Sequence, residues 1–331
     1  MAVTKPFRSG FYLGRRLLAT LLASVSLLSL FAGCQSILAT PESSVVPASI
    51  TEKSLKTASL DPKDAMYPTT LELDKDLFKF LTPSNDRDWT PEQAVLTTVD
   101  FHGDRATVHN IRDCQWRRED DFTLARYNRT FDLKQLKTVD FIVVPFSDIP
   151  GVGHTMLSFG FADGDYLAVS VEIRKEHGEE FNPIAGLFRQ YELIYVVAAE
   201  RDVIQKRVNC DLSDVYVYRS TATPEQARLL FDDVMQRVDG LANKPEFYDT
   251  LTNNCTTNIR RHINHLKSGL VPYDYHVLLP GYSDELAYNL DLIEHHGSYA
   301  QTRQRARVNE AAYIHRNSAD FSQAIRRQEE N

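Results

Sequence analysis

The chain has 331 residues, of which 43% are hydrophobic and 25% charged, a composition typical of a soluble globular protein. These proportions exclude a disordered tail, a collagen-like fibre and a protein built mainly of membrane spans. The net charge is −8, and it becomes more negative once the basic N-terminal segment is removed. Because an acidic protein repels phosphate backbones, we expect no nucleic-acid partner.

Residues 1–33 have the features of an export signal. Arg8, Arg15 and Arg16 belong to a basic segment, the apolar run LLATLLASVSLLSLFAG follows, and no acidic residue precedes Cys34. The run ends in LSLFAGC, which resembles the bacterial lipobox. This resemblance implies that Cys34 becomes the lipid-modified N-terminus; the alternative is a cleaved signal that happens to precede a cysteine.

The residues after Cys34 indicate where the protein is anchored. Gln35 stands where an inner-membrane retention signal would have Asp, so the resemblance implies an outer-membrane lipoprotein facing the periplasm. No later apolar stretch reaches the roughly 18 residues that a spanning helix needs, so we expect the lipid to be the membrane anchor. Residues 34–68 are rich in Ser, Thr, Pro, Ala and Lys without a sustained period, which indicates a flexible tether.

Strands dominate the chain after the tether. Residues 69–136 are predicted to be a strand-rich lead-in, with a hairpin formed by residues 94–101 and 106–112, and residues 137–296 are predicted to be the core domain. The strands predicted in the core are 139–146, 154–161, 166–174, 191–200 and 215–220.

Helices are expected only in the later part of the chain. Thr223 begins the sequence TPEQ, a capping-box start with proline at the first helical position, and apolar residues then recur at helical spacing as far as Leu241. Strands followed by helices predict an α+β fold with an antiparallel sheet and a later helix that bears the nucleophile. Residues 297–331 are predicted to be a polar tail.

Three cysteines remain once Cys34 is assigned to the anchor. An oxidising compartment favours a disulfide between Cys114 and Cys210, which lie in charged, irregular segments, and this pairing would leave Cys255 as the free thiol. Sequence does not fix the connectivity, so other pairings stay open.

Cys255 lies in the sequence TNNCTT, where either Asn253 or Asn254 would cap a helix that begins at the cysteine. The unpaired N–H groups and the positive dipole end of a helix stabilise a thiolate, and they would lower the pKa of this thiol. The alternative is that Cys255 is a small buried core residue.

A nucleophilic thiolate needs a general base, and His154 is the candidate. If the turn of the 154–174 hairpin centres on Asp163, His154 lies across from Glu172, whose carboxylate would hold the imidazole in one tautomer. A slip of one residue would pair His154 with Ile173 instead. The plainer interpretations are that His154 is a hydrogen-bonded turn residue and that Glu172 pairs with Arg174.

Neither a metal nor another cofactor is expected. His262 and His265 are three residues apart on the second helix and His295 and His296 are adjacent, but no close grouping has strong ligand spacing. The alternative is that His262, two helical turns after Cys255 on the same face, lines the same cleft. Because no serine lies in a G-x-S-x-G context, a serine hydrolase has little support.

The run from Val139 to Asp202, followed by PEFYDTLTNNCTTNI, resembles the N-terminal periplasmic domain of the Lnb-type lipoprotein N-acyltransferases. The likeness covers roughly residues 107–275. It implies a circularly permuted papain-like (NlpC-like) fold in which the strand with the histidine precedes the helix with the cysteine, and that order is present here. The founding enzyme continues into membrane-spanning segments that have no counterpart in this sequence.

Carried over position by position, the resemblance implies that Cys255 is the acyl-accepting nucleophile and His154 the general base. Glu172 matches the polar third position, and Arg174 matches a charged position of unknown role that we expect to support the cleft. No cofactor is implied.

We therefore expect a lipid-anchored periplasmic thiol enzyme that transfers acyl groups. Backbone N–H groups of Cys255 and Thr256, with the side chains of Asn253 and Asn254, would stabilise the oxyanion or support the cleft, and His154 would protonate the leaving group. The thioester would pass to an amine or to water, so transferase and hydrolase both stay open. A lipid or lipoprotein substrate is the first choice and a cell-wall peptide amide the second. The alternative is a non-catalytic outer-membrane lipoprotein that serves as a binding or scaffolding module.

Overall fold

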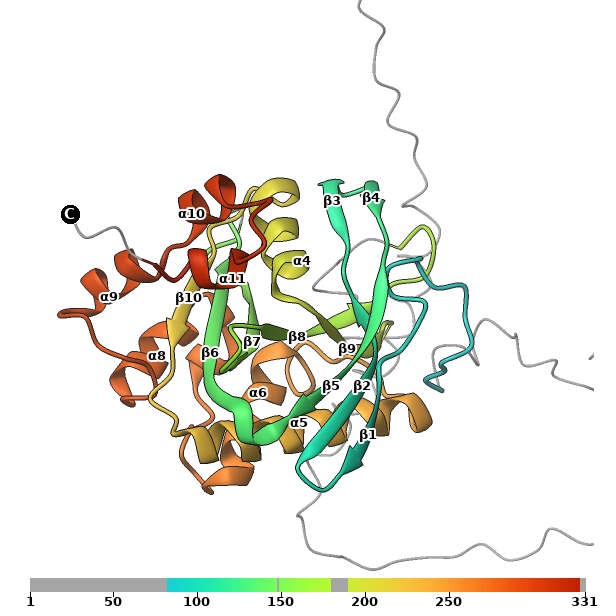
Figure 1. The fold of residues 1–331 in the computed structure, drawn as a ribbon, viewed down its shortest axis with the longest axis horizontal. Helices are drawn as coiled ribbons and strands as arrows, with labels where there is room; N and C mark the ends of the chain where they lie inside the picture. The colour runs from blue at the N-terminus through green and yellow to red at the C-terminus, as the bar shows by residue number, and fades with distance from the viewer. Residues whose placement is uncertain (1–81, 148, 180–189, 328–331) are drawn as a thin grey trace, which may run out of the picture. The chain divides into compact units, whose positions relative to one another are not determined.

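The computed structural model describes residues 82–147, 149–179 and 190–327. Within these residues, eight strands form a mostly antiparallel sheet with helices on both faces, so the predicted α+β class is confirmed (Figure 1). The strands of this sheet, in chain order, are β1 (Thr98–His102), β2 (Arg105–Arg112), β5 (Arg126–Asp132), β6 (Leu136–Pro145), β7 (Gly153–Phe161), β8 (Tyr166–Arg174), β9 (Glu192–Ala199) and β10 (Tyr216–Arg219).

Their order across the sheet is β1-β2-β9-β8-β7-β6-β10, and β5 pairs with β2. A separate two-stranded ribbon consists of β3 (Gln115–Arg118) and β4 (Asp121–Thr123). The α-helices are α4 (Glu200–Gln205), α5 (Pro224–Asn243), α6 (Cys255–Leu266), α7 (Tyr275–Leu278), α8 (Ser283–Asn289), α9 (Tyr299–Ala306), α10 (Asn309–Ile314) and α11 (Phe321–Ala324). A π-helical turn, η3 (Lys206–Cys210), follows α4, and η2 (Leu133–Gln135) and η4 (Pro280–Tyr282) are single 3₁₀ turns.

The central hairpin of β7 and β8 is formed as the sequence predicts. Gly164 in its turn has φ 88°, a conformation that glycine adopts without strain. The strands pair from Met156 opposite Ser170 to Gly160 opposite Tyr166. This register, continued by two residues along each strand, places His154 across from Glu172.

Both faces of the sheet are covered, which explains why β7 is buried at every residue. On one face, Phe159 packs edge-to-face against Phe231 of α5, with ring centroids 5.2 Å apart, and α6 joins the same core. On the other face, Met156 packs with residues of α4, α10 and α11. Odd- and even-numbered residues of β7 therefore pack into two different cores.

The predicted boundary between a lead-in and a core domain at residues 136 and 137 is not a domain boundary. β2 pairs with β9, where Arg112 lies opposite Ala198, so the lead-in strands extend the same sheet. The described residues belong to one compact unit.

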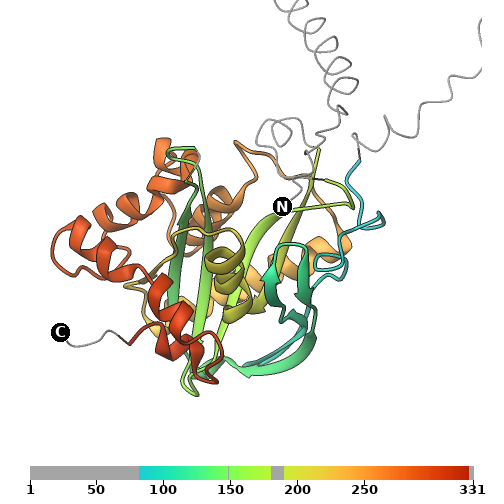
Figure 2. The same cartoon turned by 90° about the horizontal axis from the view of Figure 1, so that it is seen from above.

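The prediction that residues 297–331 are a polar tail is wrong for the part that the structure describes. Phe321 of α11 is buried in the core formed with α4. Arg326 donates to the buried carboxylates of Asp140 (Nε–Oδ2 2.7 Å) and Glu200 (Nη1–Oε2 2.8 Å). Figure 2 shows these orange and red C-terminal helices lying together beside the sheet. Their apolar positions were too widely spaced to give a strong helical period.

Other predictions lie outside the described residues: the export signal at residues 1–33, the lipidated Cys34 and the tether at residues 34–68. Among the described residues, no helix is both long enough and apolar enough to cross a membrane.

Candidate active site

The N-terminus of α6 is fixed by a capping box. The side chain of Asn254 accepts a hydrogen bond from the Thr257 N–H, and the Thr257 hydroxyl accepts one from the Asn254 N–H, each at 2.8 Å. Cys255 is therefore the first residue of the helix. The N–H groups of a first helical turn have no partner within the helix, so they are available near the sulfur.

The hairpin meets this helix end. The hydroxyls of Thr155 on β7 and Thr256 on α6 lie 3.2 Å apart. His154 and Cys255, which directly precede these two threonines in the chain, line one cleft of about 450 Å³. Glu172 lines the same cleft from β8. The structure thus brings together the three residues for which the sequence predicts a catalytic role.

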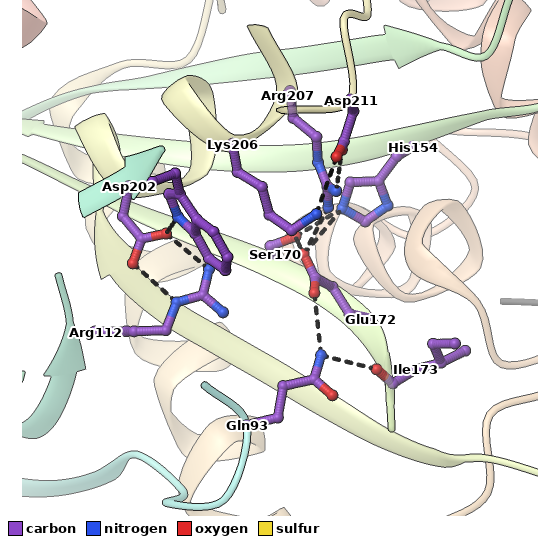
Figure 3. Close-up of polar contacts among 11 residues, drawn as sticks. Gln93, Arg112, His154, Ser170, Glu172, Ile173, Asp202, Lys206, Arg207 and Asp211 are labelled. Atoms are coloured by element: carbon purple, nitrogen blue, oxygen red, sulfur yellow. Dashed lines mark hydrogen bonds and ion pairs between the residues drawn. The ribbon is translucent and has the colours of Figure 1, made fainter. Parts of the chain in front are cut away.

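Ser170 stands between the histidine and the carboxylate, as Figure 3 shows. Its Oγ is 2.6 Å from His154 Nε2 and donates to Glu172 Oε1 at 2.7 Å, whereas His154 Nε2 and Glu172 Oε1 are 3.8 Å apart. A serine hydroxyl has one proton, and an ionised carboxylate only accepts. Ser170 therefore accepts a hydrogen bond from His154 Nε2–H, which leaves Nδ1 as the basic nitrogen.

The carboxylate of Glu172 is held in its charged form. Burial opposes the charge, but Arg207 of η3 (Nη2–Oε1 2.8 Å), His154, Arg112 and the Ser170 hydroxyl outweigh it and hold the pKa of Glu172 far below its usual range. No sequence pattern predicted Arg207 at this site, because a π-helical turn in a charged segment has no recognisable period.

The Cys255 thiol is buried and acidic. Burial disfavours the thiolate, but the hydrogen bond and the charge of His154, with hydrogen bonds from Thr155, outweigh it and lower the pKa of Cys255 to about 6. A thiolate beside an imidazolium is the arrangement found in activated cysteine nucleophiles.

Tyr248 is a cleft residue that sequence reasoning did not identify. It is 9% exposed and lines the same cleft as Cys255. Burial raises the pKa of Tyr248 well above its ordinary value, so its hydroxyl stays protonated. It stands seven residues before the cysteine, in the loop PEFYDTLTNNC, where no regular period predicts that it reaches the cleft.

With this geometry established, the chain was compared with known proteins. Residues 123–281 match the model of the Lnb N-terminal periplasmic domain family. The match covers just under half of the chain and supports the resemblance of this region to the Lnb N-terminal periplasmic domain. The matched region runs from β4 to η4 and contains His154, Glu172 and Cys255. A search of curated proteins and a search of solved structures each found no match. The description of this family supports a periplasmic location.

The side chains of the two asparagines before the cysteine form hydrogen bonds away from the cleft. The Asn254 amide donates to the Thr250 carbonyl at 2.6 Å while its oxygen caps α6, and Asn253 donates to the Phe247 carbonyl at 2.9 Å. Neither side chain lines the cleft. Both side chains hold the loop that precedes the helix, and their role at the oxyanion stays a prediction.

Arg174 is also turned away from the cleft. It is buried, it donates to the carbonyls of Gln93 (3.0 Å) and Ala94 (2.9 Å), and it lies over the Trp89 ring at 4.2 Å. It ties the segment before β1 to the sheet rather than supporting the cleft or pairing with Glu172.

The predicted disulfide between Cys114 and Cys210 is not formed, since both residues are free thiols. The Cys114 N–H donates to the buried carboxylate of Asp202 at 2.7 Å, and burial raises the pKa of the Cys114 thiol to about 12. Cys210 lines a separate hollow with Arg118 and other residues of the β3–β4 ribbon. The segments that carry the two cysteines lie near each other, but the two cysteine side chains have different neighbours.

One histidine cluster lies away from the cleft. Asp233 of α5 accepts from Nδ1 of His262 (2.6 Å) and of His265 (3.0 Å), and His262 Nε2 is 2.9 Å from the Tyr195 hydroxyl. These three acidic and imidazole groups are close enough to share a cation. His262 thus links α6 to α5 and β9 and does not line the cleft as predicted.

Proposed function

We propose that this protein is a thiol enzyme that transfers an acyl group from an ester or amide through Cys255 and His154. The observation that carries the proposal is the buried thiol with a pKa lowered to about 6, beside an imidazole whose other nitrogen is engaged by Ser170. Sites that shift a pKa this far by a specific partner within a cleft are concentrated at catalytic centres.

The reaction has two halves. The Cys255 thiol gives its proton to His154 Nδ1, the sulfur attacks the carbonyl carbon, and the C–O or C–N bond of the substrate breaks as the leaving group takes that proton from the imidazolium. An amine or a water molecule then gives a proton to His154 Nδ1, attacks the thioester carbonyl and releases the thiolate, which regains its proton.

The negative charge that develops on the substrate carbonyl oxygen must be stabilised by hydrogen-bond donors. The first-turn N–H groups of Cys255 and Thr256 serve this role in the proposal, and the protonated Tyr248 hydroxyl takes the place that the sequence had given to Asn254. Glu172 acts through Ser170 as a positioning residue, because it lies 3.8 Å from the imidazole.

The fold supports a relationship to permuted papain-like enzymes. In those enzymes the strand bearing the histidine precedes the helix bearing the cysteine, and here β7 precedes α6. The antiparallel sheet and the packing of α6 on β7 fit the same arrangement.

The proposed substrate is an acyl lipid or a lipoprotein. A lipid on Cys34 would hold the enzyme at the outer membrane, in the leaflet where such substrates occur. The family also suggests a role in lipoprotein modification.

The test is the labelling of Cys255 by an electrophilic lipid-like probe, such as an alkyl chloroacetamide, with the modified residue mapped by mass spectrometry. Wild type should react fastest at Cys255, and His154→Ala should slow that reaction by about two to four orders of magnitude. Cys114→Ser is the matched control and should leave the rate unchanged, because burial holds Cys114 as a thiol.

Equal labelling of wild type and His154→Ala would reject His154 as the base. An unreactive Cys255 in the reduced, folded protein would reject the enzyme and favour a scaffolding lipoprotein.

A further inference from the structure

A second cavity, of about 240 Å³, lies on another side of α6 from the catalytic cleft. Thr256 lines this cavity whereas Cys255 lines the cleft, and the two hollows share no lining residue. Most of its wall is aliphatic or aromatic and comes from β6, α5, α6 and α8, including Phe141, Leu230, Ile263 and Leu286. The cavity is therefore a site of its own.

The mouth of the cavity opens between α5 and α6. Leu229 of α5 lines it and is 51% exposed, and Lys267, directly after α6, lines it and is exposed. Apolar side chains are therefore open to solvent at this cavity, and an apolar ligand would cover them.

All the charged side chains among the described lining residues are cationic. They are Arg260 and Lys267, and neither forms an ion pair with a described carboxylate. Arg260 Nε donates to the Pro272 carbonyl at 3.1 Å and the guanidinium lies over the Tyr273 ring, 5.3 Å from its centroid. These contacts hold Arg260 in place while its terminal nitrogens stay available. The ligand that complements this cavity is an apolar chain with an anionic head.

We propose that the cavity binds one acyl chain of an anionic phospholipid, with the phosphate at Arg260 and Lys267. The volume is below the 300–1,000 Å³ typical of sites for drug-sized ligands, which suits part of a single chain and not a whole lipid. Each methylene buried in the cavity strengthens binding about fourfold. The site is independent of the chemistry proposed at Cys255.

The test uses the full chain in phosphatidylcholine nanodiscs that contain a little phosphatidylglycerol with a diazirine in its acyl chain. After photolysis, mass spectrometry maps the crosslinked peptides. We expect crosslinks in α5 and α6 at the cavity. Ile263→Trp, which fills the cavity, should reduce their yield at least tenfold, and the double variant Arg260→Glu with Lys267→Glu at least fivefold.

Three controls separate the proposal from its alternatives. Arg316→Glu reverses an exposed charge on another face and should leave the yield unchanged, and so should Cys255→Ala. A phosphatidylcholine probe with the same diazirine chain should crosslink at least fivefold less. The double charge variant leaves the apolar packing intact, so it remains informative if Ile263→Trp fails to fold.

The proposal is overturned by equal crosslinking of the two phospholipids or by crosslinks that the cavity variants do not change. Crosslinks spread over residues outside the cavity would also overturn it, as expected if a segment of the chain or a second copy fills the hollow. Loss of crosslinks in Cys255→Ala would assign the lipid to the catalytic cleft and overturn it too.

Discussion

Ser170 decides which nitrogen of His154 is basic. The Ser170 hydroxyl donates its one hydrogen bond to Glu172, so it accepts a hydrogen bond from His154 Nε2–H. Nδ1 is then the nitrogen that can take the proton of the Cys255 thiol. The sequence suggested direct contact between His154 and Glu172, but alternate residues of a strand share a face, so Ser170 lies on the same side as Glu172. That periodicity was the signal that could have identified it.

Ser170→Ala should therefore reduce kcat for a chromogenic acyl ester about 10- to 100-fold, because the tautomer of His154 is no longer fixed. The matched control is Ser158→Ala, which removes a buried hydroxyl farther along the same face of the sheet, where it donates to Glu200 at 2.6 Å. Steady-state kinetics on both variants checks this prediction. Similar losses of kcat in the two variants would mean that Ser170 acts only through stability.

Tyr248→Phe tests the oxyanion donor, since it keeps the ring and removes the hydroxyl. We expect kcat to fall about 100-fold with KM little changed. Alkylation of Cys255 by a chloroacetamide forms no carbonyl oxyanion, so its rate should stay within about twofold of wild type. An unchanged kcat would remove Tyr248 from the mechanism.

At the scale of elements, the capping box of α6 sets the position of the sulfur. Asn254→Ala should lower the free energy of unfolding by about 1 kcal/mol and also slow the labelling of Cys255, because the helix end loosens. Thr223→Ala removes the equivalent cap of α5, where Thr223 accepts from the Gln226 N–H at 3.2 Å.

Chemical denaturation should show a similar loss of stability in Thr223→Ala, with Cys255 as reactive as in wild type. Equal reactivity of Cys255 in both cap variants would show that the cap of α6 has no role in the chemistry.

The two capping sequences and the central hairpin were predictable, because caps, tight turns and strand alternation are local patterns. The start of α6 at Cys255 and the pairing of β7 with β8 followed from them. Arg207 and Tyr248 were not predictable, since they reach the cleft through tertiary packing of η3 and of the loop before α6. The position of Cys114 likewise depends on a hydrogen bond to Asp202, 88 residues away in sequence.

At the scale of the whole molecule, the C-terminal segment closes one face of the sheet. Arg326 neutralises Asp140 of β6 and Glu200 of α4, and both carboxylates are buried. Sequence reasoning missed this contact because its partners are 186 and 126 residues away. The described tail is thus part of the fold.

Arg326→Ala should lower the free energy of unfolding by about 3–5 kcal/mol, because it leaves the buried carboxylate of Glu200 without a cationic partner and Asp140 with Arg219 alone. Arg327→Ala is the neighbouring control. Arg327 is exposed and pairs with Asp320 at the surface, so its loss should change stability by no more than about 0.5 kcal/mol. Denaturant unfolding of both variants checks the contrast, and equal effects would contradict a clamping role for Arg326.

The central claim is that Cys255 is a thiolate held by His154, and the most direct measurement is the pH dependence of its alkylation rate. In the folded wild type the rate should rise with pH and level off above a midpoint of about 6, because the reactive form is the deprotonated sulfur. In His154→Ala the midpoint should move upward toward the ordinary thiol range near 8.5. A wild-type midpoint near 8.5, or one that His154→Ala does not move, would contradict the account.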